Sequence, residues 1–427
     1  MSNVTRPNFH PISYRGRHLF MDGVSIREVV SRVGTPCYIY SAGDIRRRFG
    51  EFDDAFATVP HRVCYAVKAN SNLAILKLFR TLGSGFDVVS GGELFRVLRA
   101  GANPRAVVFS GVGKTAEEID FALSRRIGQF NVESAAELEL LAARAQALRV
   151  KAEAGLRVNP DVDPRTHPYI ATGLREHKFG IDIHSVDELF RAARSRPFLR
   201  LRGLGFHIGS QILSLEPFAD AAAILANKVR QLRAAGFEIH TLDLGGGLGI
   251  SYRGERTPPA QALARRVLPI LRPLGCTLFF EPGRWLVGRA GVLVTRVLFL
   301  KRNGRKNFVV VDAGMNDLIR PTLYQAFHQI LPVERSTRTG SFRADVVGPI
   351  CETGDFFARD RRLRKPQPGE LLAIGETGAY GFSLASNYNA RPRCPEILID
   401  ASRARLIRRR ESPADLVRGE ILSPIRL

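Results

Sequence analysis

The stretch Cys64–Asn70, CYAVKAN, places a lysine at the end of an apolar and aromatic run. The run is typical of a buried β-strand, and Lys68 follows it between small residues. A lysine at a strand end is usually a solvated surface residue, because burying an ammonium group is costly. A partly desolvated lysine, in contrast, loses its proton more readily, and the free amine can then attack an aldehyde. The rest of the sequence has to decide between these two interpretations.

Strand-like and helix-like segments alternate from residue 63 to residue 283. Helical patterns such as NLAILKLFRTLG and SAAELELLAARAQAL separate the strands, and several end at a glycine. This alternation predicts a (β/α)8 barrel of the TIM type over residues 42–283, with residues 160–184 as a loop over the barrel mouth. The eight expected strands lie near residues 63–69, 86–90, 106–110, 127–133, 154–159, 201–208, 241–245 and 277–282.

The pattern changes after Arg284 to mostly strand-like runs. GVLVTRVLFL and FVVVDAG flank Arg302–Arg305, where Asn-Gly is a strong hairpin signal. Further strand-like runs occur at ADVVGPI, ELLAIGE and PEILIDA. We therefore expect a second, mainly antiparallel β domain from residues 1–41 and 284–427, in which RHLFM and CYIYS near the N-terminus join the sheet.

The composition excludes several classes of protein. The chain has 427 residues, of which 45% are hydrophobic and 24% charged, and no apolar run reaches the length of a membrane span. The net charge of +22 invites a nucleic-acid interpretation, but the cations are spread along the chain without a recognisable binding motif. Five cysteines without a CxxC pair suggest neither disulfides nor a metal site. We expect a cytoplasmic protein with no nucleic-acid or membrane partner.

In a (β/α)8 barrel, reactive groups lie at the C-terminal ends of the strands. Lys68, Asp87, His207 and Glu281 all occupy such positions, and the glycine run Gly245–Gly249 follows the seventh strand. We therefore expect all of them to face one mouth of the barrel.

The glycine run has two interpretations. It can be a simple turn, or it can bind phosphate, because barrels commonly bind phosphate with the loops after strands seven and eight. Strand eight adds Gly283 and Arg284 at the same place, which favours phosphate. SGVGKT is not a P-loop, since Val108 stands where glycine is required, and GGGLGI lacks the last glycine of a dinucleotide motif, having Ile250 there.

An amine, a phosphate site, a carboxylate and an imidazole at one barrel mouth indicate a pyridoxal 5'-phosphate site. Lys68 would hold the aldehyde, Glu281 would keep the pyridine nitrogen protonated, and His207 would stack on the ring. Taken singly, His207 is more often a hydrogen-bonded core histidine and Glu281 an acid in an ion pair. Their combination is what favours the cofactor.

Seven ordered blocks of the sequence carry a family resemblance: YAVKAN, FDVVSGGEL, GFHIGSQ, LDLGGGLGISY, EPGR, GPICETGD and GAYGFSLASNYNARPR. Together, over about residues 34–393, they closely resemble the diaminopimelate decarboxylases, which belong to the alanine-racemase-like, fold-type III class of pyridoxal phosphate enzymes. The resemblance implies decarboxylation of meso-2,6-diaminopimelate to L-lysine and CO2, the last step of lysine biosynthesis. It also implies a head-to-tail homodimer with shared active sites.

The resemblance further implies roles for individual residues. Lys68 is the Schiff-base lysine, and Cys351 is the proton donor that acts across the dimer interface. The other implied cofactor contacts are His207, Ser210, Gly245, Gly246, Gly247, Glu281, Gly283, Arg284 and Tyr380. The implied substrate contacts are Arg284, Arg320, Tyr324, Glu352 and Tyr380.

Other functions are separated by particular residues. An ornithine or arginine decarboxylase on the same fold acts on substrates without a distal carboxylate, so Arg320 and Tyr324, together with Glu352, favour diaminopimelate. An alanine racemase needs a second base on the opposite ring face and has no need of Cys351. A non-catalytic pyridoxal phosphate carrier would hardly require a β domain bearing Cys351 and Tyr380. For Cys351 alone, the ordinary alternative is a buried, inert thiol.

Overall fold

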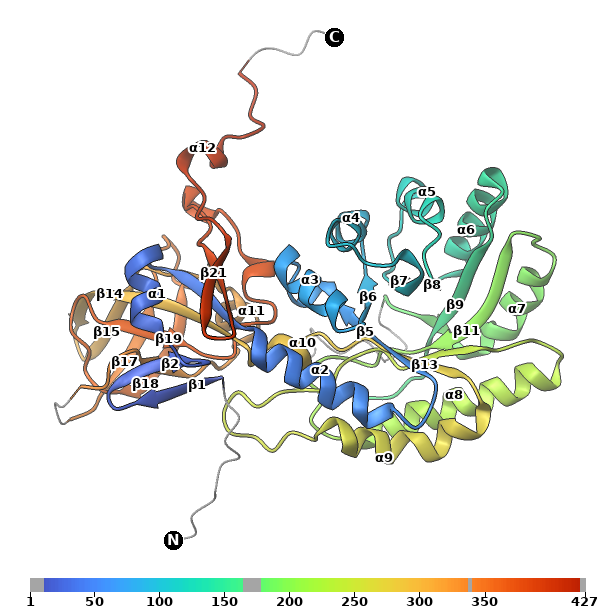
Figure 1. Cartoon of the computed structure of the whole chain (residues 1–427), viewed down its shortest axis with the longest axis horizontal. Helices are drawn as coiled ribbons and strands as arrows, with labels where there is room; N and C mark the ends of the chain where they lie inside the picture. The colour runs from blue at the N-terminus through green and yellow to red at the C-terminus, as the bar shows by residue number, and fades with distance from the viewer. Residues whose placement is uncertain (1–10, 164–177, 337–339, 423–427) are drawn as a thin grey trace. The chain divides into compact units, whose positions relative to one another are not determined.

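The computed structural model describes residues 11–163, 178–336 and 340–422 (Figure 1). The chain divides into two compact units, one of residues 45–287 and one that combines residues 1–44 with 288–427. Within the described ranges, no helix has the length and apolar character that crossing a membrane requires.

The unit of residues 45–287 contains a closed barrel of eight parallel strands. Neighbouring strands follow one another in sequence around the barrel, and β13 closes it by pairing with β5. This confirms the (β/α)8 fold predicted from the alternating pattern, and the predicted strands correspond one to one with those observed. The strands are β5 (His61–Ala66), β6 (Gly85–Val88), β7 (Val107–Phe109), β8 (Gln129–Val132), β9 (Ala152–Asn159), β11 (Leu199–Gly205), β12 (Thr241–Asp243) and β13 (Thr277–Phe280).

Helices connect these strands around the outside of the barrel (Figure 1). The predicted loop over residues 160–184 includes residues 164–177, which lie outside the described range. The last part of the predicted loop is not irregular, because β10 (Ile181–Asp182) pairs as a short parallel strand with the end of β9. The connecting helices are α3 (Leu73–Thr81), α4 (Gly91–Arg99), α5 (Ala116–Ser124), α6 (Ala135–Leu148), α7 (Val186–Arg194), α8 (Glu216–Ala234) and α9 (Ala260–Leu271), while α2 (Ala42–Phe56) precedes β5 and α10 (Arg284–Val287) follows β13.

The alternation of side chains along β5 shows how the barrel is built. Tyr65 stacks on Phe79 of α3, with ring centroids 3.9 Å apart, so its face of the strand packs against the helices. Cys64 points to the other face, where it forms a buried apolar cluster with Val108 and Phe279 from two other strands. This cluster makes the interior apolar on the side of β5, β7 and β13, whereas the strand ends above it carry polar residues.

The other unit is built on a mixed, mainly antiparallel sheet. Its strands run in the order β18-β17-β15-β14-β4-β20-β21, and β19 pairs with β14 and β16. The predicted hairpin is present, with Asn303 paired to Lys306 around Gly304, whose φ is +56°. The strands are β4 (Cys37–Ser41), β14 (Gly291–Asn303), β15 (Lys306–Val311), β16 (Ile330–Pro332), β17 (Phe342–Val347), β18 (Phe356–Leu363), β19 (Leu371–Ile374), β20 (Glu396–Asp400) and β21 (Arg403–Arg408), and the helices are α1 (Ile26–Val33), α11 (Arg320–Tyr324) and α12 (Pro413–Leu416).

One of the two expected N-terminal strands lies elsewhere. CYIYS forms β4 at the centre of the sheet, as predicted. RHLFM does not join that sheet. It forms β2 (His18–Met21), the middle strand of a separate three-stranded sheet with β1 (Ile12–Arg15) and β3 (Val24–Ser25). The tight turns on both sides of β2 pair it with its immediate neighbours, which leaves only an isolated bridge from His18 to Glu334.

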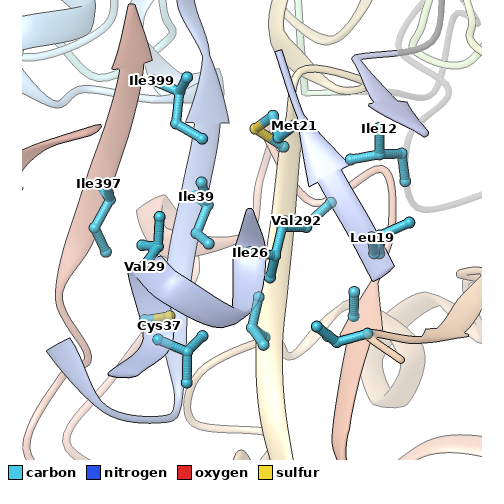
Figure 2. Close-up of a cluster of buried hydrophobic side chains, with 14 residues drawn as sticks. Ile12, Leu19, Met21, Ile26, Val29, Cys37, Ile39, Val292, Ile397 and Ile399 are labelled. Carbon is cyan, nitrogen blue, oxygen red and sulfur yellow. The ribbon is translucent and has the colours of Figure 1, made fainter. Parts of the chain in front are cut away.

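The small sheet and α1 share one hydrophobic core with the large sheet. Figure 2 shows this cluster, in which Leu19 and Met21 from β2 pack with residues of α1, β4, β14 and β20. In α1 the buried residues are Ile26, Val29 and Val30, which lie on one face at helical spacing. Ser25 begins the helix, since its side chain accepts a hydrogen bond from the Glu28 backbone N–H.

Candidate active site

Lys68 lies in a short 3-10 turn, Val67–Ala69, directly after β5. Its amine forms an ion pair with Asp87 at the end of β6. Asp87 is fully buried, whereas the Lys68 side chain keeps 35% of its surface exposed. The lysine is therefore not a solvated surface residue: its amine is anchored by a buried acid at the C-terminal end of the barrel.

Glu281 follows β13 and belongs to a buried pair of carboxyl groups with Asp243, the last residue of β12. Burial raises the pKa of Glu281 well above its usual range, and the nearby Asp243 and Asp87 raise it further, against the opposing charge of Lys68. Burial raises the pKa of Asp243 as well, but its hydrogen bond with Glu281 opposes that rise. Two acids in contact cannot both ionise easily, so Glu281 retains the proton and Asp243 carries the charge.

Two further side chains contact this carboxyl pair. The Asn131 amide donates to Oδ2 of Asp243 at 2.8 Å and to Oε1 of Glu281 at 3.3 Å. The Ser110 hydroxyl donates to the same Oε1 at 3.1 Å. Asn131 and Ser110 lie at the ends of β8 and β7, so six strand ends, those of β5, β6, β7, β8, β12 and β13, supply this polar layer.

His207 lies after β11 and is fixed by the glycine loop. The Gly246 backbone N–H donates to its Nδ1 at 3.0 Å. Burial lowers the pKa of His207 well below its usual range, and the charges of Arg157 and Lys68 lower it further. The ring is therefore neutral at physiological pH, with its proton on Nε2.

Arg157 supports the same region from β9. It makes two hydrogen bonds to the Glu133 carboxylate, at 2.9 and 3.1 Å, and one to the His207 carbonyl oxygen at 3.3 Å. The buried ion pair thereby ties the end of β9 to the segment that carries His207.

The glycine loop after β12 is packed too closely for side chains. A Cβ on Gly246 would lie 2.2 Å from the Glu281 carbonyl oxygen, and one on Gly247 would lie 2.4 Å from that of Gly209. Gly245 and Gly247 also have positive φ, at +63° and +107°. Bare main chain therefore runs between β13 and the segment after His207, as the phosphate interpretation requires.

Arg284 and Ser210 lie together near this loop. The buried Arg284 donates to the Ser210 hydroxyl at 3.0 Å and to the Tyr252 hydroxyl at 2.9 Å. Gly283 brings this end of the chain against the lysine turn, since a Cβ there would lie 2.9 Å from that of Ala69. A guanidinium and a hydroxyl next to glycine main chain form a donor set suited to an anion.

The barrel thus brings together the predicted residues that belong to it, from Lys68 to Arg284. Sequence reasoning did not assign roles to Asn131, Asp243 or Arg157. Their signal was present, because each is a polar residue at or near the C-terminal end of a predicted barrel strand.

In the β unit, Arg320 is buried at the start of α11. Its guanidinium contacts Nε2 of His328 at 2.9 Å, and Nδ1 of His328 contacts the Gly375 carbonyl oxygen at 2.8 Å. Because a carbonyl only accepts, Nδ1 carries the proton and Nε2 accepts from Arg320. Tyr324 ends the same helix and is partly buried. The ordinary alternative for Arg320, a surface ion pair, does not apply.

Cys351 and Glu352 lie on an exposed loop of the β unit. The other four cysteines are buried, so Cys351 is not the inert core thiol of the alternative interpretation. Its backbone N–H donates to the Asn389 side chain at 2.9 Å. A hydrogen bond to the Glu352 carboxylate raises the pKa of Tyr388. The segment around Tyr388 and Asn389 therefore holds both residues of the pair.

Tyr380 is partly buried in the same unit and has a φ of +56°, a conformation that costs energy for a residue with a side chain. Glu376 nearby has a φ of +53°. Such backbone strain is concentrated at functional sites, where the surrounding structure maintains it.

The barrel residues fit pyridoxal phosphate. Lys68 offers an amine for the aldehyde, and the glycine loop with Ser210 and Arg284 offers donors for the phosphate. Glu281 offers a carboxyl group that retains a proton until a base such as a pyridine nitrogen accepts it. The donor set thus matches the three polar ends of the cofactor.

Comparisons with known proteins agree with this fit. The sequence model of the pyridoxal-dependent decarboxylase, pyridoxal binding domain, matches residues 42–288. The diaminopimelate decarboxylase of Pseudomonas aeruginosa is 50% identical over 412 residues, which cover 96% of this chain and 99% of that protein. The diaminopimelate decarboxylase of Aquifex aeolicus is 47% identical over 402 residues, covering 94% and 95%.

Solved structures give the same result. The crystal structure of diaminopimelate decarboxylase from Helicobacter pylori complexed with L-lysine superposes with a TM-score of 0.90 at 44% sequence identity. The match covers 92% of this chain and 98% of that one.

Proposed function

We propose, since this chain belongs to the family of diaminopimelate decarboxylases, that it is a pyridoxal phosphate-dependent carboxy-lyase that converts meso-2,6-diaminopimelate to L-lysine and CO2. The observation that carries the proposal is the meeting of Lys68, Asp87 and the Glu281 carboxyl pair at the strand ends of one barrel. The cofactor, when bound, supplies an electron-withdrawing ring that accepts the electron pair left by CO2.

The barrel residues bind and tune the cofactor in this proposal. Lys68 would hold the aldehyde, and Asp87 accepts a hydrogen bond from its amine. Glu281, which retains a proton, would be the acid for the pyridine nitrogen, and neutral His207 would line the cofactor site without adding positive charge. Ser210, Arg284, Gly283 and the main chain of Gly245–Gly247 surround the phosphate.

The β unit supplies the substrate contacts in this proposal. Arg320, with its orientation set by His328, binds the distal carboxylate together with Tyr324. Glu352 binds the distal ammonium group of the substrate, and Cys351 donates a proton to the carbon that loses CO2. Tyr380 contacts both cofactor and substrate. A cation close to the departing carboxylate would stabilise the ground state, so the recognition arginine belongs at the other end of the substrate.

The proposal includes a homodimer in which Cys351 and Glu352 serve the barrel of the other subunit. Their exposure supports this assignment, because residues that enter the site of another subunit must lie on the surface of their own chain. We also propose a cytoplasmic location, which is supported by five free thiols, including the exposed Cys351.

A substrate panel tests the proposed function. Purified protein reconstituted with pyridoxal phosphate is given meso-diaminopimelate, L-ornithine and L-arginine separately, and released CO2 is measured. We expect rapid release from meso-diaminopimelate with one L-lysine per CO2, and little from the other two. Faster release from ornithine or arginine would refute the proposed substrate.

A further inference from the structure

A column of amide and hydroxyl groups runs up the barrel interior to the carboxyl pair. The Thr241 hydroxyl donates to Oε1 of Gln129 at 2.8 Å, and Nε2 of Gln129 donates to Oδ1 of Asn131 at 2.8 Å. Asn131 in turn donates to Asp243 and Glu281. We refer to Thr241, Gln129 and Asn131 as the amide column.

Two glycines of the barrel strands leave space for the amide column. A Cβ on Gly203 would lie 2.6 Å from the Thr241 hydroxyl oxygen, and one on Gly155 would lie 3.0 Å from Nε2 of Gln129. Glycine weakens a strand interior, so two glycines facing each other in β9 and β11 mark a close approach. Gln129 and Asn131 are both buried, at 5% and 7% exposure.

The column has one direction. Each amide oxygen accepts from the group below it, so each amide NH2 group points toward the next member. Lys114 fixes the top of the column, because its buried amine donates to the Asn131 backbone oxygen at 2.8 Å and pairs with Glu137. The amide column therefore ends with the NH2 group of Asn131, which faces the two acids Asp243 and Glu281.

We propose that the amide column is a positioning device for the reaction, which stabilises the state in which Asp243 and Glu281 are both ionised beneath the cofactor. The proposal deepens the proposed function and rests on it. When Glu281 releases its proton to the pyridine nitrogen, two buried carboxylates lie side by side. Hydrogen bonds to a charged acceptor are the strong ones, so Asn131 contributes most in that state.

The balance of the step is simple. The O–H bond of Glu281 breaks, the N–H bond of the pyridinium forms, and the electron pair of the former O–H bond stays on Glu281. No oxidant or co-reactant is needed. Without the column, the proton would stay on Glu281, and the ring would withdraw electrons less strongly.

The test compares Asn131→Leu and Gln129→Leu with a matched control, Gln231→Leu on the exposed surface of α8. With nitrogen-15 in the cofactor ring, we expect the ring nitrogen to be protonated in the wild type and control and less protonated in Asn131→Leu, with Gln129→Leu between them. We expect kcat of Asn131→Leu to fall roughly ten- to hundredfold, the factor of one lost charge-assisted hydrogen bond, with KM nearly unchanged.

A second readout needs no cofactor. In the infrared spectrum of the apoprotein, the carbonyl stretch of the protonated carboxyl should move to higher frequency in Asn131→Leu and disappear in Glu281→Gln. A loss of kcat with an unchanged nitrogen signal would overturn the proposal, because the column would then not decide whether the proton lies on Glu281 or on the ring. If Asn131→Leu does not fold, Gln129→Leu and Thr241→Val decide by the same signals. Failure of the wild type to release CO2 from diaminopimelate would refute the proposed function and leave the infrared result standing.

Discussion

Glu93 is the titrating residue whose effect on stability is easiest to isolate. Burial raises its pKa to about 7, against the opposing charge of Lys68. A carboxyl group whose pKa is raised in the folded state contributes its full stability below pH 4.5, the pKa of the group in the unfolded chain. This contribution is lost as the pH rises to about 7.

We therefore expect the free energy of unfolding of the wild-type apoprotein to fall relative to Glu93→Gln as pH rises from 4.5 to 7. The full shift corresponds to about 3 kcal/mol, which partial exposure of the side chain reduces. Calorimetry of both proteins across this pH range measures the difference. If the free energies of unfolding of the two proteins changed in parallel with pH, the raised pKa of Glu93 would be contradicted.

Cys351 gives the sharpest test of a single catalytic side chain. Cys351→Ala should bind the cofactor with unchanged absorbance, while kcat falls by roughly 10²- to 10⁴-fold, the range for loss of a positioned proton donor. Thr353→Ala, an exposed neighbour on the same loop, serves as the control. Near-normal turnover of Cys351→Ala would assign the proton to another group.

At the residue scale, the sequence predicted where the site residues lie better than it predicted which side chains they contact. Lys68 and Glu281 followed from their place at strand ends, where barrels carry reactive groups. The Asp243–Glu281 carboxyl pair did not, because β12 and β13 pair only across the helix that connects them, and a pattern along the chain does not show which side chains of two paired strands meet.

Among the elements, the glycine loop after β12 tolerates an added side chain least. Gly246→Ala places a methyl group 2.2 Å from the Glu281 carbonyl oxygen, so strand and loop must separate. We expect a loss of stability of about 1–3 kcal/mol and weaker cofactor binding. Gly113→Ala is the control, since a Cβ there meets no atom within 4 Å. Urea unfolding and cofactor titration measure both effects, and equal results for the two variants would refute the packing argument.

The predictability of elements depended on how local their signals are. The barrel strands and the hairpin at Gly304 were correct, because hydrophobic periodicity and turn residues act over a few positions. RHLFM was correct as a strand and wrong in its sheet. Short turns before and after it pair it with β1 and β3, and strand pairing is decided by such turns rather than by the strand's own composition.

For the whole molecule, the proposed dimer predicts complementation between inactive variants. If Lys68 and Cys351 of one active site come from different subunits, mixing Lys68→Ala with Cys351→Ala under subunit exchange restores one intact site per hybrid dimer. The expected recovery is about a quarter of wild-type activity for statistical exchange. Each variant mixed with itself is the control, and no recovery in verified hybrids would place both residues in one subunit.

The central claim is that Lys68 holds the cofactor, and borohydride reduction followed by peptide mapping tests it most directly. Reduction of the reconstituted protein should leave the pyridoxyl mass on the peptide that contains Lys68. The exposed Lys77 on α3 should remain unmodified, Lys77→Ala should label normally, and Lys68→Ala should retain no covalent cofactor. A pyridoxyl group on any other lysine, or its retention by Lys68→Ala, would contradict the account.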